Sequence, residues 1–312
     1  MSTPLPSAAA ASLRESLAGR LREQLPRSSV LTDEEDLRPY ECDGLSAYRM
    51  LPWIVVLPET VEQVSHVLKL CAAQNIPVVA RGAGTGLSGG ALPLADGVLL
   101  SLSKFKRILE VDPINRTATV QPGVRNLAIT EAAEPHGLYY APDPSSQLAC
   151  SIGGNVAENA GGVHCLKYGL TVHNVTGMKF MTMDGELITL GGKALDSPGY
   201  DLLAIMNGSE GMLGVMVEFT VKLLPKPERA QVVLAVFDEI EKAGDAVAAI
   251  IAQGFIPAGL EMMDNLAIRA TEEYVKAGYP IDAAAILLCE LDGTTEEVSE
   301  GIALIRTLLL KQ

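Results

Sequence analysis

The chain has 312 residues, which is long for one domain and suits two. Its 24 Lys and Arg against 38 Asp and Glu give a net charge of −14, and with 4% aromatic residues this composition disfavours a nucleic-acid partner. Five cysteines without C-x-x-C spacing, an N-terminus without a secretory pattern and apolar runs too short to span a bilayer predict a cytoplasmic protein with no metal site and no membrane span.

The first 50 residues form a helical and irregular N-terminal segment in this interpretation. Leu13, Leu17 and Leu21 share one stripe of a helix expected over residues 8–24. An acidic stretch without periodicity follows at residues 32–43 and is expected to be irregular and exposed.

A strand–helix–strand unit is expected next. Residues 54–57 are a buried-strand run, and Thr60 with Gln63 is typical of a capping box at the start of a helix. A second strand is expected at residues 77–80. The whole unit takes about thirty residues, which predicts a βαβ crossover with a parallel pair of strands.

The chain then departs from an ordinary α/β pattern, because a glycine-rich loop leads to further strands and not to a helix. These strands are expected at residues 98–102, 108–111 and 117–120, and a helix at residues 124–136 leads to a second glycine-rich stretch. Beyond residue 227, strands alternate with helices, which predicts an α+β layer with helices on one face of a sheet. The strands beyond residue 227 are expected at 231–237, 257–262 and 283–291 and the helices at 239–253, 265–277 and 295–310, whereas the strand expected at 215–224 ends the preceding unit.

The first glycine loop, from Gly84 to Gly89, matches the dinucleotide pattern G-x-G-x-x-G. That pattern binds a pyrophosphate only where a helix starts at the third glycine. Here Gly90, Pro93 and Gly97 make such a helix improbable, so an NAD-binding Rossmann domain is not expected. Successive backbone N–H groups of such a loop can still bind an anion without a helix.

Two further glycine clusters follow, at Gly153-Gly154 and between Gly208 and Gly214. One cluster alone would be explained by tight turns. Three nearly uncharged clusters on a strand-rich scaffold favour one extended ligand held by several loops, with glycine allowing close approach of the backbone.

Four segments in this order resemble the FAD-contacting segments of the vanillyl-alcohol-oxidase-type, or PCMH-type, FAD-binding family. The resemblance covers residues 53–227 and is strongest to the FAD-linked subunits of glycolate oxidase and to D-lactate dehydrogenases. The segments are Ala80-Arg81-Gly82-Ala83-Gly84-Thr85-Gly86, Asp143-Pro144-Ser145-Ser146, Ser151-Ile152-Gly153-Gly154-Asn155 with Asn159-Ala160-Gly161-Gly162, and Gly208-Ser209-Glu210-Gly211-Met212-Leu213-Gly214-Val215.

The resemblance implies an α+β fold: a PCMH-type FAD-binding domain of two α/β subdomains at 51–227, with the flavin between them. A partial ferredoxin-like substrate cap domain is expected at 228–312. The residues implied at the FAD site are Ala80, Arg81, Gly82, Ala83, Gly84, Thr85, Gly86, Pro142, Asp143, Ser145, Ser146, Gly153, Gly154, Asn155, Asn159, Gly161, Glu210, Gly211, Leu213, Gly214 and Val215.

One difference from the family's pattern bears on how the flavin is attached. Relatives that attach the flavin covalently often place a histidine near the end of the first loop, where this chain has Thr85. A threonine cannot form the histidyl link, so we expect non-covalent FAD. Cys150 lies too near Gly153-Gly154 to match the cysteine of doubly linked relatives and is interpreted as a core residue.

The activity implied is two-electron oxidation of a small 2-hydroxy acid, glycolate or D-lactate, to the 2-keto acid. Electrons would pass to a partner or acceptor, and the partners implied are a second FAD-domain subunit and an iron–sulfur subunit, through which the protein would lie peripherally at the inner membrane. Two alternatives stay open: a flavin-binding assembly module without turnover of its own, and an FAD enzyme of other chemistry on the same scaffold.

No catalytic residue is assigned. Relatives continue beyond the length of this chain and complete the cap with histidines and an arginine that bind a metal and the substrate carboxylate. The chain is therefore interpreted as a fragment or a short form. The four histidines show no metal-binding spacing, and His164, beside the Gly161-Gly162 turn, could approach the flavin without acting in catalysis.

Overall fold

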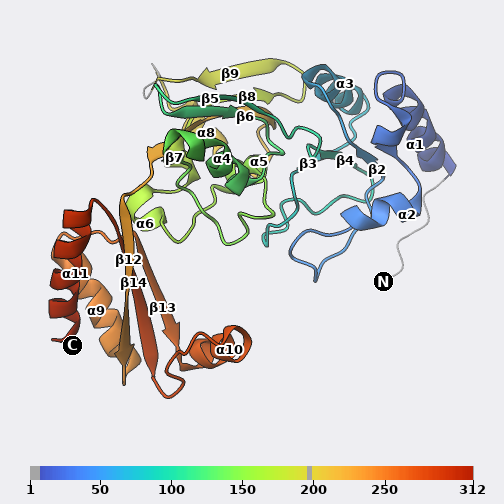
Figure 1. Cartoon of the computed structure of the whole chain (residues 1–312). Coiled ribbons are helices and arrows are strands. Elements are labelled where there is room, and N and C mark those ends of the chain that lie inside the picture. The colour runs from blue at the N-terminus through green and yellow to red at the C-terminus, as the bar shows by residue number, and fades with distance from the viewer. Residues whose placement is uncertain (1–7, 195–198, 312) are drawn as a thin grey trace. The chain divides into compact units, whose positions relative to one another are not determined.

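The computed structural model describes residues 8–194 and 199–311, which form two units (Figure 1). Unit 1 consists of the residues up to Tyr140 together with Ser146–Ala160 and Thr171–Leu224. Unit 2 consists of Ala141–Ser145, Gly161–Leu170 and the residues from Pro225 onward. The two short segments of unit 2 therefore come from the middle of the sequence, and residues 1–7 of the expected N-terminal segment lie outside the described residues.

The first sheet of unit 1 has the order β1-β2-β4-β3. The expected strand–helix–strand unit is present as β2, α3 and β3, but β4 lies between the two strands and pairs in parallel with both. The predicted crossover is thus confirmed, whereas its strands are not neighbours. The elements of this half are α1 (Ala8–Leu21), η1 (Arg27–Ser29), β1 (Val30–Leu31), α2 (Glu34–Leu37), η2 (Arg38–Tyr40), β2 (Ile54–Val56), α3 (Val61–Ala72), β3 (Val78–Arg81) and β4 (Val98–Ser101).

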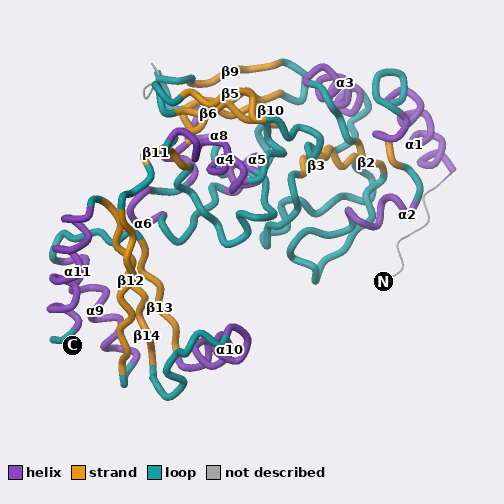
Figure 2. The backbone as a smooth tube through the Cα atoms, in the orientation of Figure 1, coloured by secondary structure: helices purple, strands orange, loops and turns teal. Residues whose placement is uncertain are grey.

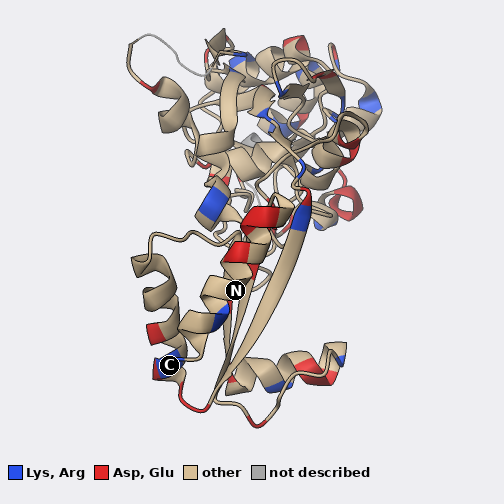
Figure 3. Cartoon of the chain, turned by 60° about the vertical axis from the view of Figure 1, so that its left-hand side comes forward, with Lys and Arg blue, Asp and Glu red and all other residues tan. Residues whose placement is uncertain are grey.

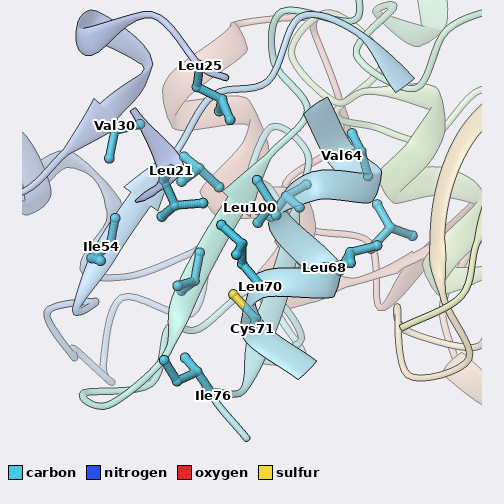
Figure 4. Packing of buried hydrophobic residues seen from close by; sticks show 14 of the residues in the cluster. Leu21, Leu25, Val30, Ile54, Val64, Leu68, Leu70, Cys71, Ile76 and Leu100 are labelled. Atoms are coloured by element: carbon cyan, nitrogen blue, oxygen red, sulfur yellow. The ribbon is translucent and has the colours of Figure 1, made fainter. Parts of the chain in front are cut away.

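Helix α3 begins where its capping residues predict. The Thr60 side chain accepts a hydrogen bond from the Gln63 backbone N–H, but Gln63 Oε1 accepts from the backbone N–H of Glu59 at 2.7 Å and so reaches one residue further back than expected. The apolar stripe of α3 packs on the sheet, and Figure 4 shows part of this core, to which α1 contributes Leu21 and β4 contributes Leu100. Burial of these side chains is the main force that joins α1 and α3 to the sheet.

The second sheet of unit 1 is antiparallel, with the order β5-β6-β10-β8-β9 (Figure 2). The hairpin of β8 and β9 lies in a stretch for which no element was predicted, although Asp184-Gly185 is a turn signal and Gly185 has φ of +72°. The strands are β5 (Ile108–Asp112), β6 (Thr117–Val120), β8 (Val175–Met181), β9 (Leu187–Gly191) and β10 (Val215–Lys222), and a short ribbon pairs β7 (Leu138–Tyr139) with β11 (Leu224–Pro225).

Short helices contribute to the core of the antiparallel sheet. The Gly153-Gly154 pair lies inside one of them, α5, where no helix was predicted. Ile129 and Ile152, from two of these helices, are fully buried against Phe219 of β10. The helices are α4 (Asn126–Ala133) with η3 (Glu134–His136), α5 (Ile152–Glu158), α7 (Thr171–Asn174) and α8 (Leu202–Met206).

Unit 2 is built on a three-stranded antiparallel sheet with the order β12-β14-β13. The strands β12 and β13 run in the same direction with β14 between them, which is a split βαβ arrangement. The elements are α6 (Cys165–Tyr168), β12 (Arg229–Phe237), α9 (Ile240–Ala252), β13 (Gly259–Asp264), α10 (Asn265–Val275), β14 (Ala285–Gly293) and α11 (Thr295–Leu309).

The helices of unit 2 pack against different residues of this sheet. Leu287 and Leu291 of β14 lie in a core that α9 and α11 share, whereas Ile286 packs with Ile268 of α10. The expected alternation of strands and helices is confirmed, and the chain as a whole has the predicted α+β fold. Figure 3 shows the Lys and Arg residues dispersed over many elements, and no helix among the described residues combines the length and apolarity needed to cross a membrane.

Candidate functional site

The three glycine segments of unit 1 converge in space. The loop that follows β3 is joined to the start of α5, because the Ala83 backbone N–H donates to Ser151 Oγ at 3.2 Å. The turn that precedes β10 is joined to the end of α5, because the Glu210 N–H donates to the Ala157 carbonyl at 2.9 Å. Both glycine loops are therefore hydrogen-bonded to the same short helix or its N-cap. Segments that lie more than a hundred residues apart in the sequence are close together in space.

Several backbone positions at this place exclude larger residues. Gly84 and Gly211 have φ of +71° and +77°, which favours glycine. A Cβ on Gly82 would collide with Ser151 Oγ, so the loop can approach α5 only with glycine there. A Cβ on Gly211 would lie 3.6 Å from the Ala80 Cβ, which shows that the third segment reaches the end of β3. The glycines thus bring three backbones close together.

Arg81 supports the first loop from within the protein. Its guanidinium donates to the carbonyls of Cys42 at 2.8 Å and Ala91 at 3.3 Å, and its Cζ lies 5.8 Å from the centre of the Tyr40 ring. Burial lowers the pKa of Arg81, while the charge of nearby Asp43 acts in the opposite direction. The side chain is only 8% exposed, so we infer that Arg81 fixes the base of the loop and offers little of its charge to a ligand.

Three buried polar atoms at the convergence have no hydrogen-bond partner within the described part of the chain. They are Asn155 Nδ2, Asn207 Oδ1 and Ser209 Oγ. Buried polar atoms are nearly always paired in folded proteins, so such a group calls for a ligand or bound water. Donors and acceptors beside loops with glycine-specific backbone fit a large polar ligand such as FAD.

The end of the first glycine loop that is farther from β3 in the sequence lies beside acidic side chains. Ser88 Oγ donates to Glu158 Oε2 at 3.1 Å, and a Cβ on Gly90 would lie 2.9 Å from Glu158 Oε1 and 3.6 Å from Glu210 Oε2. Two carboxylates at this end would repel a phosphate. The half of the loop nearer β3 is therefore better suited to an anionic group.

Unit 2 contains a separate charged cluster around His164. Its Nδ1 lies 2.6 Å from Asp143 Oδ2, and its Nε2 lies 3.4 Å from Glu290 Oε1. The hydrogen bond with Asp143 and the charges of both carboxylates outweigh burial and raise the pKa of His164 to about 9. The raised pKa favours the protonated imidazole at neutral pH, in which form it cannot accept a proton as a general base.

The predicted site residues fall into the two units. Only Pro142, Asp143, Ser145 and Gly161 belong to unit 2, and the remaining ones belong to unit 1. The predicted list of FAD residues omits Ser151 and Ser209, although both lie in the segments that resemble the FAD-contacting ones, and it omits Asn207, which lies just outside them. Their one sequence signal is a polar side chain within or beside a glycine cluster, which does not by itself distinguish a buried polar atom from a surface one.

Three of the five cysteines, Cys71, Cys150 and Cys289, are buried. All five are free, and Cys150 is buried, as expected for a core residue. Burial raises the pKa of the Cys71 and Cys289 thiols to about 12, which keeps both protonated. Among the described residues no group of three or more His, Cys, Asp and Glu could hold a metal ion.

Comparison with protein families assigns this architecture to a class. Residues 52–191 match the model of an FAD binding domain, and residues 226–310 match the C-terminal domain of FAD linked oxidases. The first match contains two of the three glycine segments of unit 1, and the second contains the sheet of unit 2. The protein is thus a flavoprotein whose cofactor is FAD.

Similarity to individual proteins narrows the class of flavoprotein further. The chain is 64% identical over 298 residues to the glycolate oxidase subunit GlcD of Escherichia coli (strain K12), covering 96% of this chain and 60% of the relative. It is 35% identical over 291 residues to a D-lactate dehydrogenase of Anaerostipes hadrus, covering 91% and 61%. The chain belongs to the FAD-linked oxidases of the PCMH type, and it spans about three fifths of the length of these relatives.

The fold has a close counterpart among solved structures. A structure of alkyldihydroxyacetonephosphate synthase superposes with a TM-score of 0.81 at 19% identity, covering 95% of this chain and 59% of the other. At that level of identity the likeness concerns the fold alone.

Proposed function

We propose that the chain binds FAD in the convergence of the three glycine segments and takes part in oxidising a small 2-hydroxy acid, glycolate or D-lactate, to the 2-keto acid. The observation that carries the proposal is that Asn155, Asn207 and Ser209 each have a buried polar atom without a hydrogen-bond partner among the described residues, beside loops of glycine-specific conformation. The substrate class is supported by the identity to a glycolate oxidase subunit and a D-lactate dehydrogenase.

Different residues are proposed to bind different groups of the cofactor. Backbone N–H groups of residues 82–86, apart from that of Ala83, which donates to Ser151 Oγ, are the proposed ligands of the pyrophosphate, because Glu158 and Glu210 make the other end of the loop unfavourable for an anion. Asn155 and Ser209 supply the donor and acceptor that the protein itself leaves unused. When bound, FAD supplies the two-electron acceptor, and the protein orients the substrate and excludes water.

The attachment of FAD is proposed to be non-covalent. Thr85 occupies the position at which covalent relatives often carry a histidine, and Cys150 is buried. Electrons are proposed to leave the flavin for a partner or acceptor, in line with the word subunit in the name of the Escherichia coli relative. A second FAD-domain subunit and an iron–sulfur subunit, with attachment to the inner membrane through them, remain the proposed partners.

An absorbance spectrum of the purified chain tests the proposal. We expect flavin bands that move to the supernatant after acid precipitation and that bleach on anaerobic addition of glycolate or D-lactate. Acetate, which lacks the 2-hydroxyl group, is the control and should leave the bands unchanged. Flavin that is retained but never bleaches would favour a binding module without turnover, and failure to bind added FAD would refute the proposed site.

A further inference from the structure

Strand β12 is an edge of the sheet of unit 2 and has a long, regular open side. Its nine residues pair with β14 without any irregularity in the register. The order β12-β14-β13 leaves the other side of β12 without a neighbouring strand in the described part of the chain. Backbone N–H and C=O groups on such a side form a row to which a further strand can pair.

Other edge strands of this protein carry features that oppose such pairing. Strand β13, at the opposite edge of the same sheet, has only six residues and includes Glu261 and Asp264. Strand β5, at an edge of the antiparallel sheet of unit 1, carries Glu110 and Asp112 and has a register irregularity against β6. Charged side chains, prolines and bulges are the devices that protect edges, and residues 230–237 of β12 have none of them.

The face of β12 that points away from α9 and α11 is apolar and exposed. The odd-numbered residues from 233 to 237 point toward these helices and belong to the core that the helices cover. The alternate residues Val232, Leu234 and Val236 point to the opposite face, where they are 52%, 41% and 53% exposed. The open edge therefore offers a neighbouring strand an apolar stripe as well as hydrogen-bonding groups.

The sequence of β12 is complementary to itself when two copies of the strand run antiparallel about a two-fold axis. With the axis at Leu234, the Val232 side chain of one copy lies opposite Val236 of the other, and the two Leu234 side chains lie opposite each other. Cross-strand pairs of this β-branched and aliphatic kind stabilise a sheet. All three exposed apolar positions are then matched by apolar partners.

Charged residues at the ends of the strand favour this register. With the axis at Leu234, Arg229 lies opposite Glu239 of the other copy, which is still in extended conformation just beyond the strand. An axis one residue earlier would instead place Glu228 opposite Asp238. Like charges that lie directly opposite each other destabilise a strand pair, whereas opposite charges stabilise it.

We propose that β12 pairs with β12 of a second copy of this chain, so that the sheets of the two copies join into one continuous antiparallel sheet. Each copy fills the open edge of the other, because a two-fold axis relates the two strands. The contact therefore closes as a dimer and leaves no β12 edge for further copies.

Sedimentation velocity of the purified full chain, over a dilution series in the micromolar range, tests the proposal. We expect a dimer that dissociates on dilution. Leu234→Lys would bring two ammonium groups together at the axis and should raise the dimer dissociation constant at least about a hundredfold. Ile251→Lys is the matched control, because Ile251 lies on α9 and is 42% exposed, and it should leave the constant unchanged.

An exchange of charges tests the register and does not depend on whether Leu234→Lys folds. Arg229→Glu and Glu239→Arg should each raise the dissociation constant about tenfold, because the charge pair occurs twice in the dimer. The double variant restores opposite charges and should return to within about twofold of the wild-type constant. Equal constants in the wild type, both single variants and the double variant would overturn this pairing.

Hydrogen exchange locates the contact on the chain. Amides along β12 should be protected in the wild-type dimer and exchange faster in Leu234→Lys, while those of β13 stay unchanged. A chain that is monomeric throughout the dilution series would overturn the proposal. Protected β12 amides in such a monomer would assign the edge to another segment of the same chain. A dimer that persists in Leu234→Lys would place the interface elsewhere and would likewise overturn it.

Discussion

Replacement of Gly153 by alanine is expected to lower the free energy of unfolding of unit 1 by about 1–3 kcal/mol and to weaken FAD binding with it. The added Cβ would lie 2.7 Å from the Pro122 Cβ and 3.1 Å from the Pro122 carbonyl oxygen. The Gly153 N–H donates to that carbonyl at 2.9 Å, so the helix cannot shift away without breaking the hydrogen bond. The better helix propensity of alanine, worth about 1 kcal/mol, offsets only part of this cost.

Gly154→Ala is the matched control, one residue further along the same helix. The nearest atom to its Cβ would be Ser151 Oγ at 3.7 Å, which is ordinary contact. We expect its stability in urea unfolding to equal or exceed that of the wild type by up to about 1 kcal/mol. A loss of FAD affinity in this variant without loss of stability would support contact between Gly154 and the cofactor. Equal midpoints for the two alanine variants would contradict the packing argument for Gly153.

Arg81→Met is expected to lower the free energy of unfolding by about 3 kcal/mol and to abolish retention of FAD through purification. The methionine fills much of the space but leaves the carbonyls of Cys42 and Ala91 without the charged donor that both now share. It also removes the positive charge that interacts with Asp43, which is itself 7% exposed. The base of the first glycine loop would lose its support from residues 40–45.

The measurement is urea unfolding together with the flavin content of the purified protein. Arg125→Met is the control, because Arg125 is half exposed and meets Glu131 at 3.4 Å on the surface, so its loss should change stability by about 0.5 kcal/mol or less. Arg81→Lys should be intermediate, since it keeps the charge but not the fork of donors. A stable Arg81→Met variant that retains full flavin would show that the loop stands without this side chain.

Local signals in the sequence were sufficient for most of the elements. The periodicity over residues 61–72 and 240–252 predicted α3 and α9 because each helix must place its apolar residues on one side to bury them. Strands such as β12 and β14 were predicted from apolar runs between turn residues. Among the elements that were not predicted is the hairpin of β8 and β9, whose outer strand β9 is largely exposed and therefore lacks a strong apolar pattern.

The glycine clusters show what a short sequence pattern can predict and what it cannot. They predicted the cofactor, because glycine in such numbers without charge marks close backbone approach, and the family comparison confirms FAD. They did not predict that Gly153 and Gly154 lie inside a helix. Glycine is a poor helix former, but packing of α5 on Pro122 requires a residue without a side chain and overrides propensity.

The sequence by itself determined the class of elements, the α+β fold and the nature of the cofactor, since each depends on residue type and short-range spacing. Only the tertiary structure decided that β4 lies between β2 and β3 and that Asp143 and His164 belong with β14. It also showed that Asn155 Nδ2 and Ser209 Oγ are buried without a hydrogen-bond partner among the described residues. Strand order, burial and ion pairing at a separation of more than a hundred residues depend on which surfaces pack together. No neighbouring residues in the chain encode that choice.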